Sequence, residues 1–179
     1  MQGKSEGPPH NSLAYIALGS NIDAPTDRIE EALYRLKTRF VPKIQVLRVS
    51  SLWSTPPWGP VEQDDFVNAV VEIETAFLPE ELLQAVLQIE KEMCRERLVR
   101  WGPRRIDLDL LAYDAIQYNS NTLTLPHPRW AERAFVLLPW TEISPNFRPH
   151  PRGMTLCESL MLLPANELTS CLKLSRSLK

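Results

Sequence analysis

The stretch from Trp101 to Leu111, which reads WGPRRIDLDLL, holds the side chains best suited to chemistry. From Ile106 onward, apolar and acidic residues alternate, and this period predicts a β-strand with Asp107 and Asp109 on one face. Two neighbouring carboxylates repel each other, so a cation between them would stabilise the strand. Mg²⁺ is typically held by one or two carboxylates together with phosphate oxygens. The pattern therefore indicates a magnesium and phosphate site.

Arginines gather just upstream of this predicted strand, in a segment whose Gly102-Pro103 pair is typical of a loop. They are Arg95, Arg97, Arg100, Arg104 and Arg105. The planar guanidinium offers a fork of donors that matches phosphate oxygens. The alternative is that the two aspartates lie on a solvated sheet face and form surface salt bridges with these arginines, which is a common arrangement. Spacing alone leaves both interpretations open.

Composition restricts the class of protein. The chain has 179 residues, 44% of them hydrophobic, and a net charge of -2. That length suits one domain with a substantial core, and the charge provides no general attraction to nucleic acid or anionic membranes. Three cysteines without metal-ligand spacing fit a reducing cytosol. No apolar run is long enough to span a membrane, and the first residues lack a signal-peptide core, so we expect a cytoplasmic protein.

The rest of the chain predicts the elements that position the acidic strand. Apolar runs and alternating patterns predict strands at Leu13–Leu18, Ile44–Trp53, Phe66–Thr75 and Ile106–Ala112. Helical spacing after Pro25 and after Pro79 predicts a helix at each place. Prolines and a glycine predict a loop over Ser54–Asp65. The order β-α-β-β-α-β predicts the α+β class, with a ferredoxin-like, mostly antiparallel sheet and its helices packed on one side.

The remaining segments are interpreted more simply. Residues 1–12 are expected to be a disordered leader, residues 13–165 a single domain, and residues 166–179 a C-terminal tail whose last dozen residues are loosely held. A helical segment is expected near Arg129–Trp140, after a loop around Pro126-His127-Pro128. The apolar stretch after Met154 could dock as a further helix.

Five sequence blocks, found in order from about Ala14 to about Pro145, resemble the 6-hydroxymethyl-7,8-dihydropterin pyrophosphokinases of folate biosynthesis. They are AYIALGSN, SSLWSTPPWGP, FVNAVVEIET, CRER followed by RWGPRRIDLDLL, and LPHPRWAERAFVLLPW. The resemblance implies transfer of an intact pyrophosphoryl group from ATP to the hydroxymethyl oxygen of the pterin, which releases AMP. It also implies ATP as co-substrate, two Mg²⁺ ions, only small-molecule substrates with neither nucleic acid nor membrane as partner, and a monomer.

The resemblance further implies a role for individual residues. Asp107 and Asp109 match the ligands of the two ions, and Arg95 and Arg104 match the two catalytic arginines. The positions that contact ATP match Glu90, Arg97, Arg100, Thr124, His127 and Arg133. The positions that bind the pterin match Thr55, Pro56, Trp58, Phe66, Asn68, Trp101 and Phe135. Phe66 and Asn68, two residues apart on one strand, share a face and offer a ring and an amide to a flat heterocycle.

The chain departs from the family pattern at three places. Cys94 stands where the family usually has a glycine, Trp58 is bulkier than the aliphatic residue expected there, and the segment between Arg95 and Trp101 is short. Two alternatives of other classes are a non-catalytic nucleotide or pterin binder and a nucleic-acid-binding ferredoxin-like domain. The presence of both aspartates and both arginines disfavours the first. The acidic balance and the lack of an aromatic RNA-binding strand motif disfavour the second.

Overall fold

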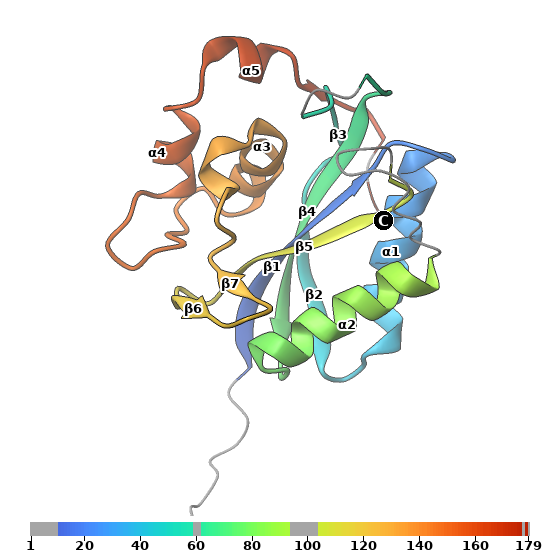
Figure 1. Ribbon diagram of the computed structural model, residues 1–179, viewed down its shortest axis with the longest axis vertical. Coiled ribbons are helices and arrows are strands. Elements are labelled where there is room, and N and C mark those ends of the chain that lie inside the picture. Colours follow the sequence, from blue (N-terminus) through green and yellow to red (C-terminus); the bar gives the residue numbers. More distant parts are fainter. Residues whose placement is uncertain (1–10, 59–61, 94–103, 177, 179) are drawn as a thin grey trace, which may run out of the picture.

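The protein is built on an antiparallel sheet of six strands (Figure 1). The structure is a computed structural model that describes residues 11–58, 62–93, 104–176 and 178. The strands are β1 Ser12–Ser20, β2 Ile44–Val49, β3 Trp53–Thr55, β4 Phe66–Thr75, β5 Asp107–Tyr113 and β8 Leu172–Lys173. β1 lies between β5 and β4, β4 also pairs with β2 and β3, and β8 pairs with β3. With one helix after β1 and one after β4, this is the predicted ferredoxin-like arrangement, and the fold class is confirmed.

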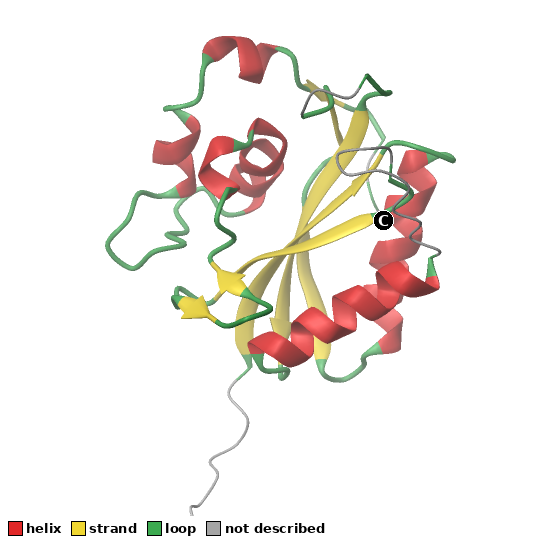
Figure 2. Ribbon diagram, viewed as in Figure 1, coloured by secondary structure: helices red, strands yellow, loops and turns green. Residues whose placement is uncertain are grey.

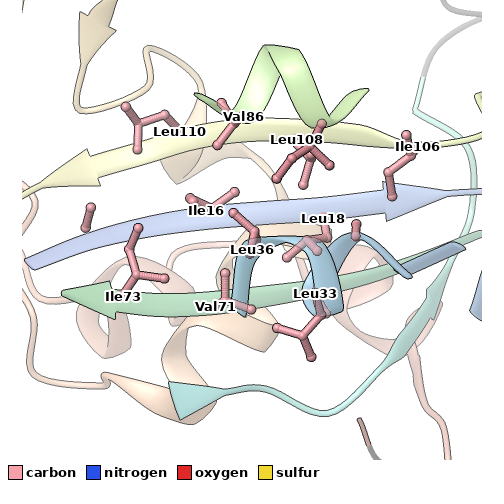
Figure 3. Packing of buried hydrophobic residues seen from close by; sticks show 14 of the residues in the cluster. Ile16, Leu18, Leu33, Leu36, Val71, Ile73, Val86, Ile106, Leu108 and Leu110 are labelled. Atoms are coloured by element: carbon pink, nitrogen blue, oxygen red, sulfur yellow. The ribbon is translucent and has the colours of Figure 1, made fainter. Parts of the chain in front are cut away.

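One face of the sheet is covered by α1 Pro25–Arg39 and α2 Pro79–Glu92, which both begin at the predicted prolines. Ile16 and Leu18 on β1 pack there with Leu33 and Leu36 of α1 (Figure 3). Leu108 on β5 joins the same apolar cluster. Alternate strand residues and helix residues three to four apart thus meet in one buried layer, because each element presents its apolar side to the other.

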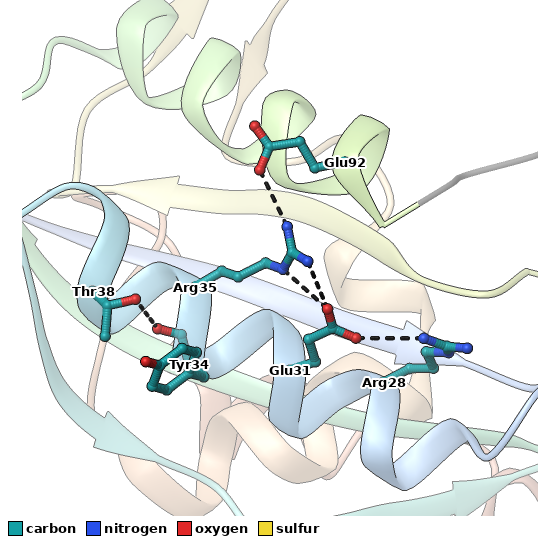
Figure 4. Close-up of polar contacts among 6 residues, drawn as sticks. All are labelled: Arg28, Glu31, Tyr34, Arg35, Thr38 and Glu92. Atoms are coloured by element: carbon teal, nitrogen blue, oxygen red, sulfur yellow. Dashed lines mark hydrogen bonds and ion pairs between the residues drawn. The ribbon is translucent and has the colours of Figure 1, made fainter.

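Charged side chains also link the outer sides of these two helices. Arg35 of α1 bonds both Glu31, one turn earlier, and Glu92 at the end of α2 (Figure 4). Arg39 forms a second ion pair with Glu92, whose nearest atoms are 2.6 Å apart. Single surface pairs contribute little, but this network holds the end of α2 against α1 at the point where the chain enters the arginine-rich segment.

The other face of the sheet is covered by α3 Ala134–Ile143, and α4 Leu156–Leu160 packs against α3 (Figure 2). Tyr15 and Val70 point to this side and pack with Trp140 in a second apolar cluster. The two helices of the predicted β-α-β-β-α-β unit lie on one side of the sheet, as predicted, and α3 covers the opposite side. The strands carry apolar residues on both faces, and removing both from water requires cover on both sides. The remaining short elements are the 3₁₀ turn Trp130–Glu132, the hairpin of β6 Tyr118–Asn119 and β7 Thr124–Leu125, and α5 Ala165–Thr169.

The predicted strand Ile44–Trp53 is two strands, β2 and β3. The pairing of β2 with β4 shifts register between Val46 and Arg48. At Ser50 the ladder is interrupted, because the Val70 N–H donates to the Ser50 hydroxyl at 2.9 Å. The loop expected over Ser54–Asp65 is also wrong at its start, since Ser54 belongs to β3 and pairs with β4.

The chain termini differ from the expectation in part. Residues 1–10 of the expected leader lie outside the described residues, and Ser12 already belongs to β1. The last dozen residues were expected to be loosely held, which is wrong for Lys173, paired with Trp53 across β8 and β3, and for Arg176, ion-paired with Asp27 and Glu30 of α1. The division into a domain over residues 13–165 and a tail stays a prediction. Within the described ranges, no helix combines the length and the apolar character needed to cross a membrane.

Candidate functional site

A row of site residues runs across the sheet on the α3 side. Strand register places Asp107 opposite Gly19, Gly19 opposite Asn68, and Asn68 opposite Trp53. Directly opposite residues of an antiparallel pair share a face, so these side chains line one surface. A Cβ atom added to Gly19 would lie 2.8 Å from the Oδ1 atom of Asn68. Glycine is therefore required at this position to let the amide lie across β1.

The two aspartates stand at the start of β5, as predicted. Asp107 lies opposite Gly19, and Asp109, two residues further along β5, lies opposite Ala17. Both carboxylates are half-buried. The guanidinium of Arg104 contacts the Asp107 carboxylate. Between the aspartates, the Leu108 N–H donates to Oε1 of Glu90 at 2.8 Å, and Glu90 is only 2% exposed. In the structure Glu90 thus anchors β5 to α2, and its expected contact with ATP stays a prediction.

Asn21, which the sequence analysis did not identify, fixes the backbone of Arg104. Its Oδ1 accepts from the Arg104 N–H at 2.8 Å, and its own N–H donates to the Arg104 carbonyl at 3.1 Å. Its Nδ2 donates to Oε1 of Gln63 and to the Asp64 carbonyl, both at 3.0 Å. One buried amide therefore joins the segment before β5 to the segment before β4. The only signal in the sequence was a Ser-Asn pair at the end of a buried strand.

His127 lies beside the aspartates as a neutral imidazole. Its backbone N–H donates to the Leu111 carbonyl of β5 at 2.8 Å. Its Nδ1 accepts from the Arg129 N–H at 3.2 Å, which assigns the ring proton to Nε2. Burial, and next the charge of Arg133, lower the pKa of His127 to about 4. At neutral pH the ring therefore offers a single N–H donor from Nε2.

Arg133 completes the cationic side of the site. Burial lowers the pKa of its guanidinium, and the charge of Asp109 opposes this effect more strongly than that of Asp107. Its Nε is buried and makes no hydrogen bond with any described residue. A buried guanidinium nitrogen with an unused donor suits an anionic ligand, because an unsatisfied buried donor is costly.

The residues expected to bind the pterin form a second part of the same surface. The Asn68 amide donates to the Thr55 hydroxyl at 2.8 Å, and these two side chains are 8% and 1% exposed. Phe66 pairs with Thr55 across β4 and β3 and is half-buried. Phe135 lies in the first turn of α3, with the Arg133 guanidinium 5.5 Å from its ring centroid. Pro56 follows Thr55 on the exposed loop.

Some expected residues are not brought to this surface by the described contacts. The hydroxyl of Thr124 donates to the Asn119 side chain within the β6–β7 hairpin, at 3.1 Å. Arg95, Arg97, Arg100 and Trp101, together with Cys94, lie outside the described residues. Within the described part of the chain, no group of three or more His, Cys, Asp and Glu side chains could hold a metal ion alone.

Comparisons with known proteins show similarity in sequence and in fold. The family model described as 7,8-dihydro-6-hydroxymethylpterin-pyrophosphokinase matches residues 15–145. Two proteins named 2-amino-4-hydroxy-6-hydroxymethyldihydropteridine pyrophosphokinase are similar over 133 residues, which is 74% of this chain. The one from Methylorubrum extorquens is 45% identical over 83% of its length, and the one from Bacillus subtilis is 44% identical over 78%. A crystal structure of a Plasmodium falciparum HPPK-DHPS mutant shares the fold, with a TM-score of 0.69 and 14% identity over 94% of this chain and 48% of that chain.

Proposed function

Because this chain belongs to the 7,8-dihydro-6-hydroxymethylpterin-pyrophosphokinase family, as its sequence blocks predicted, we propose that the polar row on the α3 side of the sheet is its active site. The enzyme transfers a pyrophosphoryl group from ATP to 6-hydroxymethyl-7,8-dihydropterin, and it belongs to folate biosynthesis. The observation that carries the site assignment is the register that aligns Asp107, Gly19 and Asn68 on one face. This register joins the expected phosphate and pterin halves of the site.

The proposal includes dependence on Mg²⁺, held by Asp107 and Asp109. The donor set fits the ion, since two carboxylates on one strand face supply hard oxygens and leave positions for phosphate oxygens and water. Bound there, Mg²⁺ ions would neutralise charge on the triphosphate and orient it, and the resemblance implies two of them. The contact of Arg104 with Asp107 supports the proposal, because it places a positive charge next to this carboxylate. Once Asp107 ligates an ion, the Arg104 guanidinium can turn to a phosphate oxygen.

The protein's own residues would act mainly by positioning and charge stabilisation, because pyrophosphoryl transfer requires little covalent work. Arg133, with its buried Nε, and the Nε2–H of His127 would donate to ATP oxygens, and Arg104 would stabilise charge on the transferring group. The hydroxymethyl oxygen would attack the β-phosphorus with AMP as the leaving group. Roles for Arg95 and for the other expected residues outside the described ranges stay predictions from the resemblance.

The pterin would lie between Phe66 and Phe135, with its polar edge on Asn68. The Thr55 hydroxyl accepts one hydrogen bond from the Asn68 amide. The second N–H and the carbonyl oxygen of that amide can form hydrogen bonds with the heterocycle. Thr55, Pro56 and Trp58 would frame this end of the slot. We also propose that the enzyme acts as a cytoplasmic monomer on these two small molecules, from its composition and the resemblance.

The decisive experiment mixes the protein with ATP and 6-hydroxymethyl-7,8-dihydropterin, with Mg²⁺ or with EDTA, and separates the nucleotides by ion-exchange chromatography. We expect AMP to form in step with pterin consumption when Mg²⁺ is present and to be absent with EDTA. ADP as the product would contradict pyrophosphoryl transfer. Equal rates with EDTA would contradict the metal assignment, and intact ATP in a folded, magnesium-replete sample would favour a non-catalytic binder.

A further inference from the structure

Trp58 lies against two guanidinium groups. The Cζ atom of Arg129 is 4.1 Å from the centroid of the Trp58 ring, and that of Arg133 is 5.4 Å away. Both distances fall within the range in which a cation is attracted by an aromatic face, and tryptophan is the strongest partner. Arg133 also lies against Phe135, so cations and rings alternate from Arg129 to the first turn of α3.

This stack joins two segments that are far apart in the sequence. Trp58 lies three residues after Thr55, which accepts the Asn68 hydrogen bond on the pterin side. Arg129 lies two residues after His127 and donates its N–H to the His127 ring on the nucleotide side. The contact of Arg129 with Trp58 therefore ties the segment after β3 to the segment after β7.

Arg129 also forms an ion pair, which is an alternative explanation for the position of its side chain. Its Nε lies 3.2 Å from Oε2 of Glu132, whose side chain is 62% exposed. An exposed ion pair of this kind contributes little to stability, and its loss should not change pterin affinity. The stack is different, because it fixes a half-buried indole that follows directly on residues of the expected pterin slot.

We propose that Arg129 is a positioning residue for pterin binding, which acts by holding the Trp58 indole at the edge of the slot. This inference rests on the proposed function of the site. Neither the sequence patterns nor the resemblance pointed to Arg129. Trp58 is one of the places where the chain departs from the family, and Arg129 supplies the cation that matches the larger ring.

The test measures pterin affinity by isothermal titration calorimetry with Mg²⁺ and α,β-methylene ATP, whose methylene bridge prevents pyrophosphoryl transfer. We expect Arg129→Ala to weaken pterin binding by roughly three- to tenfold, and Arg129→Lys to recover part of the loss, because a cation remains over the ring. In steady-state turnover the KM for the pterin should rise by a similar factor, while kcat changes by less than about twofold. The control is Glu132→Ala, which removes only the ion pair and should leave pterin affinity unchanged.

A double-mutant cycle with Trp58→Leu decides whether the two side chains act together. If they do, Arg129→Ala in the Trp58→Leu background has no further effect on pterin affinity. Independent, multiplying effects, an unchanged Arg129→Ala variant, or a Glu132→Ala variant that reproduces the loss would each overturn the inference. Pterin binding by the wild type without AMP production would contradict the proposed function instead, and the binding measurement would still test Arg129.

Discussion

The two faces of the sheet use the same strands for opposite purposes. Toward α1 and α2, β4 presents Val67, Ala69, Val71 and Ile73. Toward α3 it presents Phe66, Asn68, Val70 and Glu72, of which Asn68 and Glu72 are buried polar groups. β5 alternates in the same way between leucines and aspartates. One face is therefore an apolar layer that needs no partner beyond the helices, and the other carries groups that each require one.

The polar face is itself divided. Beneath α3 the buried carboxylate of Glu72 has partners within the protein, since it accepts from Arg48 at 2.7 Å and from the Ser144 hydroxyl at 2.6 Å. Burial raises the pKa of the neighbouring Tyr15, so its hydroxyl stays protonated and donates to Ser144. At the other end the charges of Asp109 and Asp107 act on Arg133, whose buried Nε makes no hydrogen bond with any described residue. This contrast teaches that polarity alone does not mark an active site.

The largest expected effect is the loss of turnover when Asp109, on the site face of β5, is changed. Asp109→Asn keeps the side-chain shape and removes one of the two charges proposed to hold Mg²⁺. Turnover should fall by about a thousandfold or more, on the scale of a well-placed charged group in phosphoryl transfer. The free energy of unfolding should change by less than about 1 kcal/mol, because the carboxylate is half-buried next to a like charge. AMP formation and urea denaturation measure the two quantities, and near-full activity would disprove the metal site.

The converse change lies on the apolar face. Leu18 is fully buried in the layer under α1 and is adjacent in sequence to Gly19 of the site row. Leu18→Ala should lower the free energy of unfolding by about 2–5 kcal/mol, because it removes buried methyl groups and leaves a cavity. Activity of the folded fraction should stay within a few-fold of the wild type. A loss of turnover as large as that of Asp109→Asn, in a folded sample, would break the distinction between the two faces.

A smaller effect is expected where β1 crosses the site. Gly19→Ala places a methyl group 2.8 Å from the Asn68 Oδ1, and that amide is held by Thr55. The amide must shift, so pterin affinity should fall by about tenfold, on the scale of one misplaced hydrogen bond. Gly153→Ala is the matched control, since its methyl would lie 3.0 Å from the His150 Cβ and outside the site row. If calorimetry gives the same pterin affinity for both variants, Asn68 does not form a hydrogen bond with the pterin.

Local patterns predicted much of this fold. β4 has the predicted bounds, Phe66–Thr75, because its alternation is uninterrupted, and both sheet helices begin at the prolines that start them. The break between β2 and β3 depends on the Ser50 hydroxyl that takes a ladder hydrogen bond from Val70, which no local pattern reveals. The cover by α3 and the pairing of β8 with β3 were also missed, since both depend on contacts between distant segments.

The site follows the same division. The alternation on β5 and β4 placed Asp107 with Asp109, and Phe66 with Asn68, on shared faces, and the register joined the two pairs through Gly19. Asn21 and Arg129 escaped prediction because their importance lies in partners more than 40 residues and about 70 residues away in sequence, as the contacts with Gln63 and Trp58 show. Alternation along a strand predicts the face of the sheet on which a side chain lies. The distant loop that the side chain contacts is seen only in the structure.

The smallest predicted effect concerns the pH dependence that His127 adds to stability. Its pKa in the folded protein is about 4, below the ordinary value of about 6.5 in an unfolded chain. Between these values the unfolded chain binds a proton that the folded protein does not, so stability falls as the pH drops from about 6.5 toward 4. One such group contributes at most about 1.4 kcal/mol per pH unit, and less here because the ring is partly exposed to solvent. Above about pH 6.5 this contribution is constant.

The measurement compares wild type with His127→Gln by urea unfolding at pH 4.5, 5.5 and 7.0. The wild type should lose stability on acidification more steeply than the variant, and subtracting the two curves cancels the contributions that both proteins share. Parallel curves would mean that the pKa of the ring is the same in the folded and the unfolded protein, so that folding does not favour the neutral ring. His127 would then titrate near its ordinary pKa of about 6.5, and below that pH a charged imidazole would be available to ATP.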